Sequence, residues 1–168
     1  MTLDIAIDAD AEWDSSKDWA AIARSAAAAA IAESAFPQLG QGERTVELSV
    51  RLTSDDEVHA LNSEWRGKDK PTNVLSFPMA EERDLDAGSR PGPELMLGDI
   101  ILASGVCTAE AADKGVALED HAAHLMVHGT LHLLGYDHGD DDSAADMEGR
   151  EVRALARLGI ADPYEGER

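Results

Sequence analysis

Three histidines and one glycine impose the strongest constraint on how this chain can fold. The histidines are His128, His132 and His138, and the glycine is Gly135. Residues four apart lie on one face of a helix, so the first two imidazoles can converge on one point. Gly135 can take the positive φ that ends a helix and turns the chain, which lets His138 approach from outside it. The pattern predicts a helix that ends near Gly135 and a three-histidine site for one divalent ion.

The ligand set favours zinc, with one ion expected per chain. Three neutral imidazoles leave a fourth tetrahedral position open, which is typical of a catalytic site. The spacing equals that of the metzincin peptidases, whose motif carries a Glu general base after its first histidine. Position 129 is Gly here, so peptide hydrolysis by that route should fail. A zinc peptidase or amidase is nevertheless the first alternative function. We hypothesise that Gly129 lets substrate or backbone approach the helix closely.

Other polar residues near the motif are candidates for supporting roles. His121 and His124 extend the stripe formed by His128 and His132. His124 is a candidate to bind the ion or to hold one of its ligands, whereas His121 is expected at the surface or in packing. Asp137 could orient a ligand imidazole by accepting its second N–H, or it could simply be a turn residue.

Positive charge is scarce and locally concentrated. The chain has 14 Lys and Arg against 34 Asp and Glu, a formal net charge of −20. Such a body argues against non-specific coating of nucleic acid, and no DNA partner is expected. Arg66, Lys68 and Lys70 nevertheless cluster beside Trp65. Arginine can grip a phosphate through two N–H groups, and tryptophan can stack on a base. The cluster is interpreted as a substrate-binding surface, with a solvated helix end as the alternative.

Hydrophobic periodicity predicts four strands and five helices. Strands are expected at 3–7, 45–52, 73–77 and 97–102, and helices at about 17–36, 55–65, 104–114, 118–134 and 141–158. Residues 79–96 are rich in Asp, Glu, Gly and Pro and are expected to form an exposed acidic loop. The order of elements predicts a single α+β domain over residues 1–168, with a small sheet covered by helices.

Membrane and secretory classes are not expected. No stretch approaches the roughly 20 apolar residues of a membrane helix, so no membrane partner is expected. The first residues lack the basic start and apolar run of a signal peptide. The one cysteine, Cys107, cannot form a disulfide within the chain, which suits a reducing compartment. A cytoplasmic location is therefore expected.

Several segments resemble the YbeY family of bacterial endoribonucleases, also called rRNA maturation factors. The resemblance covers about residues 45–164. It rests on His128–His138 with its glycine second position, on Arg66–Pro78, on Leu97–Ile100 and on the ending Leu158–Tyr164. One departure is Asn73, where many members of the family have Asp.

The resemblance implies a metal-dependent endonuclease that acts on single-stranded RNA, with an α+β fold and a small mixed sheet of four strands. It implies a role in maturing the 3′ end of 16S rRNA and in ribosome quality control. The metal ligands carry over to His128, His132 and His138, and the functional arginine to Arg66; His128 and Arg66 are the expected catalytic residues. Expected partners are the 16S rRNA precursor, the small ribosomal subunit and ribosome-assembly proteins. The second alternative is a non-catalytic assembly factor in which the metal only holds the fold.

Overall fold

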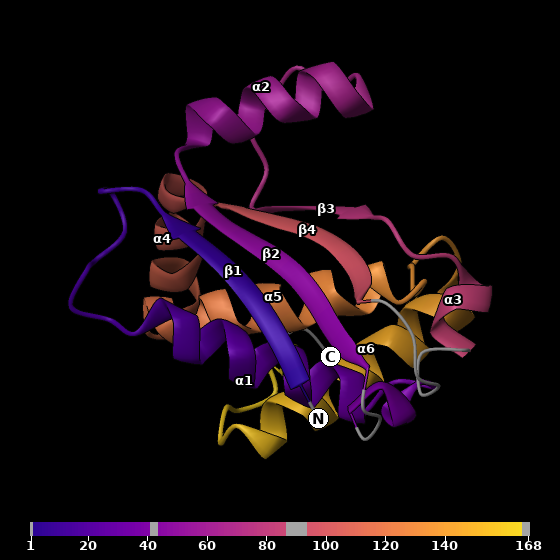
Figure 1. Ribbon diagram of the computed structural model, residues 1–168. Helices are drawn as coiled ribbons and strands as arrows, with labels where there is room; N and C mark the ends of the chain where they lie inside the picture. Colours follow the sequence, from indigo (N-terminus) through magenta and orange to yellow (C-terminus); the bar gives the residue numbers. More distant parts are fainter. Residues whose placement is uncertain (1, 41–43, 87–93, 166–168) are drawn as a thin grey trace.

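One mixed sheet of four strands organises the molecule (Figure 1). The structure, a computed structural model, describes residues 2–40, 44–86 and 94–165. The strand order is β1-β2-β4-β3; β1, β2 and β4 are parallel, and β3 is antiparallel to β4. The strands are β1 (Thr2–Ala9), β2 (Thr45–Thr53), β3 (Val74–Pro78) and β4 (Leu95–Ala103). The expected α+β fold with a small mixed four-stranded sheet is confirmed.

The helices follow the hydrophobic pattern closely, with one exception. They are α1 (Trp19–Ala32), α2 (Asp55–Arg66), α3 (Glu82–Asp86), α4 (Ser104–Lys114), α5 (Leu118–Leu133) and α6 (Asp141–Arg157), with a 3₁₀ turn at Pro37–Gly40. The expectation of a plain loop over residues 79–96 was wrong, because α3 lies within that segment. Leu85 holds α3 to the core and is only 3% exposed. Residues 87–93 of the expected loop lie outside the described residues.

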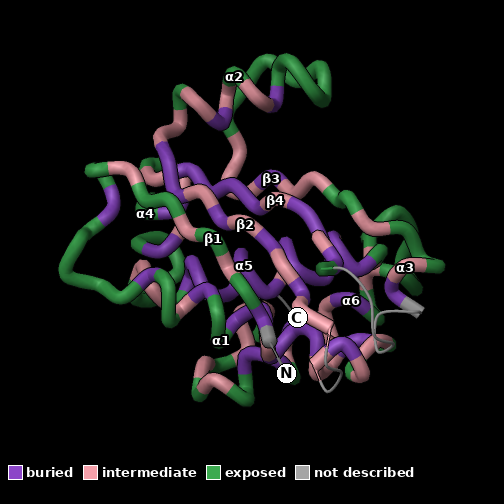
Figure 2. Tube along the Cα trace, in the orientation of Figure 1, coloured by how far each residue is buried: buried purple, intermediate pink, exposed green. Residues whose placement is uncertain are grey.

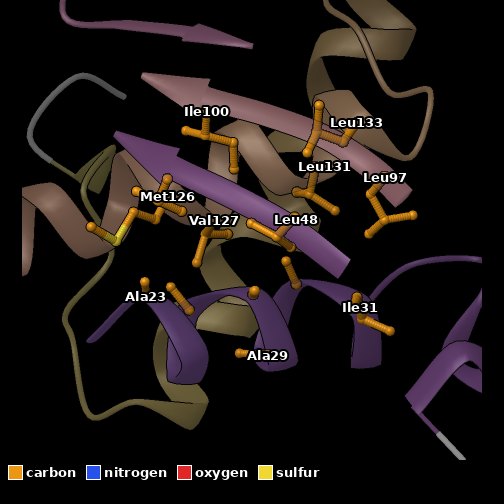
Figure 3. Close-up of a cluster of buried hydrophobic side chains, with 14 of the residues drawn as sticks. Ala23, Ala29, Ile31, Leu48, Leu97, Ile100, Met126, Val127, Leu131 and Leu133 are labelled. Atoms are coloured by element: carbon orange, nitrogen blue, oxygen red, sulfur yellow. The ribbon is translucent and has the colours of Figure 1, made fainter. Parts of the chain in front are cut away.

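Helix α5 lies at the centre of the fold. Figure 1 shows α1, α5 and α6 on one side of the sheet and α2 on the other. Most of α5 is buried (Figure 2). Its buried side chains include Met126, Val127 and Leu131. Small residues on α1, such as Ala23, let this helix approach α5 closely in the apolar cluster (Figure 3). A helix fixed on several sides is a rigid carrier for functional side chains.

Helix α2 is held to the sheet by a charged contact as well as by apolar packing. Its N-cap is Ser54, whose hydroxyl accepts from the backbone N–H of Glu57. The Arg51 guanidinium of β2 donates to both carboxylate oxygens of Glu57, at 2.6 and 2.8 Å. This bond and one from the Thr53 hydroxyl lower the pKa of Glu57 from 4.5 to about 2. The contact therefore holds the N-terminal end of α2 against the sheet and so helps to fix the position of the whole helix.

Stability should depend on pH through this contact. Because the folded pKa of Glu57 is depressed, its contribution is present above about pH 4.5 and is lost as pH falls through about 2. Urea titrations of wild type and Glu57→Gln should differ by on the order of 1 kcal/mol at pH 6, after allowance for partial exposure. The difference should vanish toward pH 2. Glu64→Gln removes the same charge from the exposed side of α2 and should show no such trend; a wild-type advantage that persisted at pH 2 would contradict the assignment.

Within the described ranges, none of the helices combines the length and apolar character that crossing a lipid bilayer requires.

Candidate metal centre

The three histidines of the motif meet at the end of α5. His128 and His132 lie one turn apart on this helix, which ends at Leu133. Gly135 takes a φ of 98°, and the N–H of Tyr136 bonds back to the carbonyl of Leu131 at 3.0 Å. This turn brings His138 back toward the helix, so that one ring nitrogen from each histidine lies within 4.8 Å of the others.

Hydrogen bonds fix which ring nitrogen faces the shared point. Nδ1 of His128 lies 2.7 Å from a carboxylate oxygen of Glu151, and Nδ1 of His132 lies 2.8 Å from the carbonyl oxygen of Tyr136. Since ionised carboxylate and carbonyl oxygens only accept, both Nδ1 atoms carry the proton. In neutral rings both Nε2 atoms therefore present lone pairs.

Those lone pairs provide the test of whether a cation fits. The Nε2 atoms of His128 and His132 are 3.0 Å apart, a distance at which two acceptors repel unless a positive charge lies between them. Nitrogen ligands on tetrahedral zinc lie about 3.3 Å apart, given Zn–N bonds of about 2.0–2.1 Å. Separations from 3.0 Å to 4.8 Å bracket that value. Burial, followed by the neighbouring His128, lowers the pKa of His132 to about 4, so this ring is neutral at pH 7, as a ligand must be. The group fits a divalent ion.

A buried carboxylate supports the histidines from α6. Glu151 is 1% exposed, and its Oε1 lies 2.7 Å from Nδ1 of His128 and 3.2 Å from Nε2 of His124. Its Oε2 accepts from the Tyr164 hydroxyl at 3.0 Å. Burial alone raises the pKa of Glu151, but the bonds to His124 and His128 outweigh it and lower the pKa to about 2. The side chain is therefore an ion at neutral pH.

Sequence reasoning missed Glu151, although a signal was present. On α6 the buried residues are Met147, Glu151, Ala154 and Leu155, which recur at the three- and four-residue spacing of one helix face. A single carboxylate on an otherwise apolar face must have partners in the interior. The sequence did not reveal which side chains the carboxylate of Glu151 contacts.

The other residues that the sequence singled out near the motif have different contacts. His124 reaches Glu151 and the Tyr164 hydroxyl, and so it is one step removed from the three-histidine group. His121 is buried and lies 2.9 Å from Glu110; burial is the main reason that its pKa is lowered. The carboxylate of Asp137 accepts from the backbone N–H of Gly139, which is a bond of the turn.

The histidines open onto a cleft of about 660 Å³ that reaches α2. Trp65 and Arg66, at the end of α2, line one side of it, and residues of β3 such as Ser76 line another. Trp65 is 67% exposed, so its ring is available for stacking. Lys68 and Lys70 are exposed on the segment that follows α2 and do not belong to the lining. The cleft thus joins the metal group to one arginine and one exposed indole.

Packing against the sheet explains the glycine at position 129. A Cβ there would lie 2.9 Å from Cγ2 of Ile100 on β4 and 3.2 Å from Cδ1 of the same side chain. All three of the closest atoms belong to this buried core side chain. None of them is backbone, and the core side chain fills the space that a substrate would need. The hypothesis of close approach by substrate or backbone was therefore wrong. The missing Cβ lets α5 sit directly on the sheet.

Known proteins are similar to this chain along almost its whole length. The family model described as "Endoribonuclease YbeY" matches residues 9–159. The chain is 55% identical over 164 residues to an "Endoribonuclease YbeY" of Sphingopyxis alaskensis, with 96% of this chain and 97% of the relative covered. It is 52% identical over 164 residues to the protein of the same name from Rhizorhabdus wittichii, with 96% of each covered.

A solved structure supports the fold. A Thermotoga maritima protein, known from a solution structure, superposes with a TM-score of 0.54 at 21% identity and covers 94% of this chain and 92% of its own.

Proposed function

Since the chain belongs to the YbeY family of endoribonucleases, we propose that it is a zinc-dependent enzyme that cleaves single-stranded RNA. We further propose that it acts in the cytoplasm, on the 3′ end of the 16S rRNA precursor in the small ribosomal subunit, together with ribosome-assembly proteins. The observation that carries the proposal is that three convergent histidines and Arg66 line the same cleft.

The residues of the cleft divide the chemistry between them. His128, His132 and His138 would hold the zinc ion, which when bound supplies Lewis-acid stabilisation of charge on a phosphoryl oxygen. The guanidinium of Arg66 can donate two N–H groups to the same phosphate and so stabilise the negative charge that grows in the transition state. Trp65 can stack on an adjacent unpaired base.

A local arginine also resolves the tension between an acidic protein and an RNA substrate. The net charge of −20 disfavours long-range attraction to phosphate. Attraction at the scissile phosphate would therefore come from short contacts within the cleft, from Arg66 and the bound cation. Lys68 and Lys70, which lie outside the cleft lining, are proposed to contact RNA beyond the scissile phosphate.

Two other functions fit the structure less well. A peptidase of the metzincin type needs a carboxylate base after the first histidine, and position 129 is Gly. A non-catalytic assembly factor would need the metal only for folding. The opening of the histidines onto a cleft of about 660 Å³ favours a catalytic site instead, because structural zinc sites are closed.

The proposal predicts that purified wild type holds about one zinc per chain and that His132→Ala loses it. Mass spectrometry should detect the loss, and cleavage of single-stranded RNA should fall by about 10³-fold or more. His59→Ala is the matched control, because His59 lies on α2 and bonds Asp69 instead. Wild type that takes up no metal, or that cleaves RNA equally well in a chelator, would overturn the proposal. Chelator-sensitive cleavage of casein without cleavage of RNA would favour the peptidase.

The attacking oxygen can be identified from the product ends. Attack by the RNA 2′-hydroxyl leaves a 2′,3′-cyclic phosphate, whereas attack by water does not. Asp137 is the one carboxylate in the cleft lining within the part of the chain described, so it is the candidate carboxylate base for an attacking water. We propose water as the nucleophile; a cyclic phosphate would exclude it.

A further inference from the structure

The buried carboxylate of Glu151 has no neighbouring lysine or arginine among its described hydrogen-bonding partners. These partners are His128, His124 and the Tyr164 hydroxyl. His128 contacts Glu151 through its Nδ1 and turns its Nε2 toward Nε2 of His132. A single imidazole ring therefore connects the buried carboxylate to the point on which the three histidines converge.

The orientation of each partner agrees with this arrangement. His124 is 6% exposed, and its Nδ1 is a buried atom without a hydrogen bond in the described structure. If the proton of His124 is on Nε2, that ring donates to Glu151 and its orphan Nδ1 is a lone pair rather than an unsatisfied N–H. All three partners then donate to the carboxylate, which leaves Glu151 as the acceptor of the network.

Tyr164 brings the segment after α6 into the same network. The N–H of Ile160 bonds the carbonyl of Leu155 at 3.0 Å and closes the end of α6. Asp162 accepts from the N–H of Tyr164 at 2.8 Å, and the Tyr164 ring packs edge-on against His124 with centroids 5.4 Å apart. The hydroxyl is thereby held on Oε2 of Glu151.

We infer that Glu151, held by Tyr164, is a positioning residue that fixes His128 with its Nε2 lone pair toward the metal point and sets the affinity for the ion. By accepting the Nδ1 proton in a hydrogen bond, the carboxylate makes the imidazole Nε2 a stronger ligand for the cation. The negative charge of the carboxylate also offsets the charge of the cation. The inference rests on the proposed metal site. It assigns a role to the C-terminal segment, which the spacing of the histidines does not address.

The test measures zinc affinity directly in the full-length chain. Zn²⁺ is titrated into metal-free wild type and Glu151→Gln against a competing chelator, and thermal unfolding is followed with and without the ion. Glu151→Gln keeps the shape of the side chain and should raise the Kd for Zn²⁺ by about 10–100-fold. The rise in unfolding temperature on adding zinc should shrink accordingly. Tyr164→Phe should raise the Kd by about threefold to tenfold, as expected for loss of one supporting hydrogen bond.

Each outcome has a distinct meaning. Glu148→Gln removes a charge from the same helix without touching this network and should leave the Kd unchanged. If Glu151→Gln alters only the unfolding temperature of the metal-free protein and leaves the Kd within twofold of wild type, Glu151 merely supports the fold and the inference is wrong. If Glu151→Gln does not fold, an unchanged Kd in Tyr164→Phe overturns it instead. Failure of wild type to bind zinc would refute the proposed function itself.

Discussion

Replacing Arg66 with alanine should lower the rate of RNA cleavage by about 10²–10³-fold, the usual effect of removing one donor that stabilises transition-state charge. Fold and zinc content should stay unchanged, because Arg66 is exposed at the end of α2 and does not belong to the three-histidine group. The loss should fall mainly on kcat, since charge on the phosphate grows in the transition state. Single-turnover cleavage of a labelled single-stranded RNA at saturating enzyme measures it.

Two further variants show whether the position of the charge matters. Arg83→Ala removes the same charge from α3, where Arg83 is 83% exposed and pairs with Glu81, and should cleave RNA like wild type. Arg66→Lys keeps the charge but loses the two-pronged geometry, so its activity should be intermediate. If Arg66→Ala matched wild type, catalysis through Arg66 would be refuted and an assembly role without catalysis would gain support.

Gly98→Ala should destabilise the protein by about 3 kcal/mol or more. Gly98 has a φ of 144°, and a Cβ there would lie 2.2 Å from the carbonyl oxygen of Phe77 and 2.9 Å from Cδ2 of Leu133. The first of these atoms is backbone and cannot rotate away. The clash would push β3 from β4 and disturb α5, which carries the histidines.

Gly115→Ala separates this clash from backbone strain. Gly115 also has a positive φ, 68°, but a Cβ there would have no neighbour within 4 Å. Its cost should therefore be only about 1–2 kcal/mol, the left-handed penalty for a residue with a side chain. Urea unfolding of both variants gives the comparison. Equal destabilisation would mean that the approach of Phe77 and Leu133 is unimportant.

The amino-acid sequence by itself determined the local part of the metal centre. His128 and His132 share a helix face because they are four residues apart, and Gly135 supplies the turn that returns His138. The parallel strands could be predicted equally well, since the buried positions of β2 alternate with less buried ones. These features depend on backbone periodicity within one element, so spacing along the chain is enough to predict them.

The tertiary structure decided which distant elements meet the histidines. Arg66 reaches the cleft only because α2 is docked across β3 and β4, and Glu151 finds His128 only because α6 packs against α5. The reason for Gly129 likewise became visible only when Ile100 was placed beside it. Such pairs depend on how helices and strands pack at particular angles and separations, and no periodicity within a single segment encodes that. The sequence predicted the three-histidine group, whereas packing determined which side chains contact it.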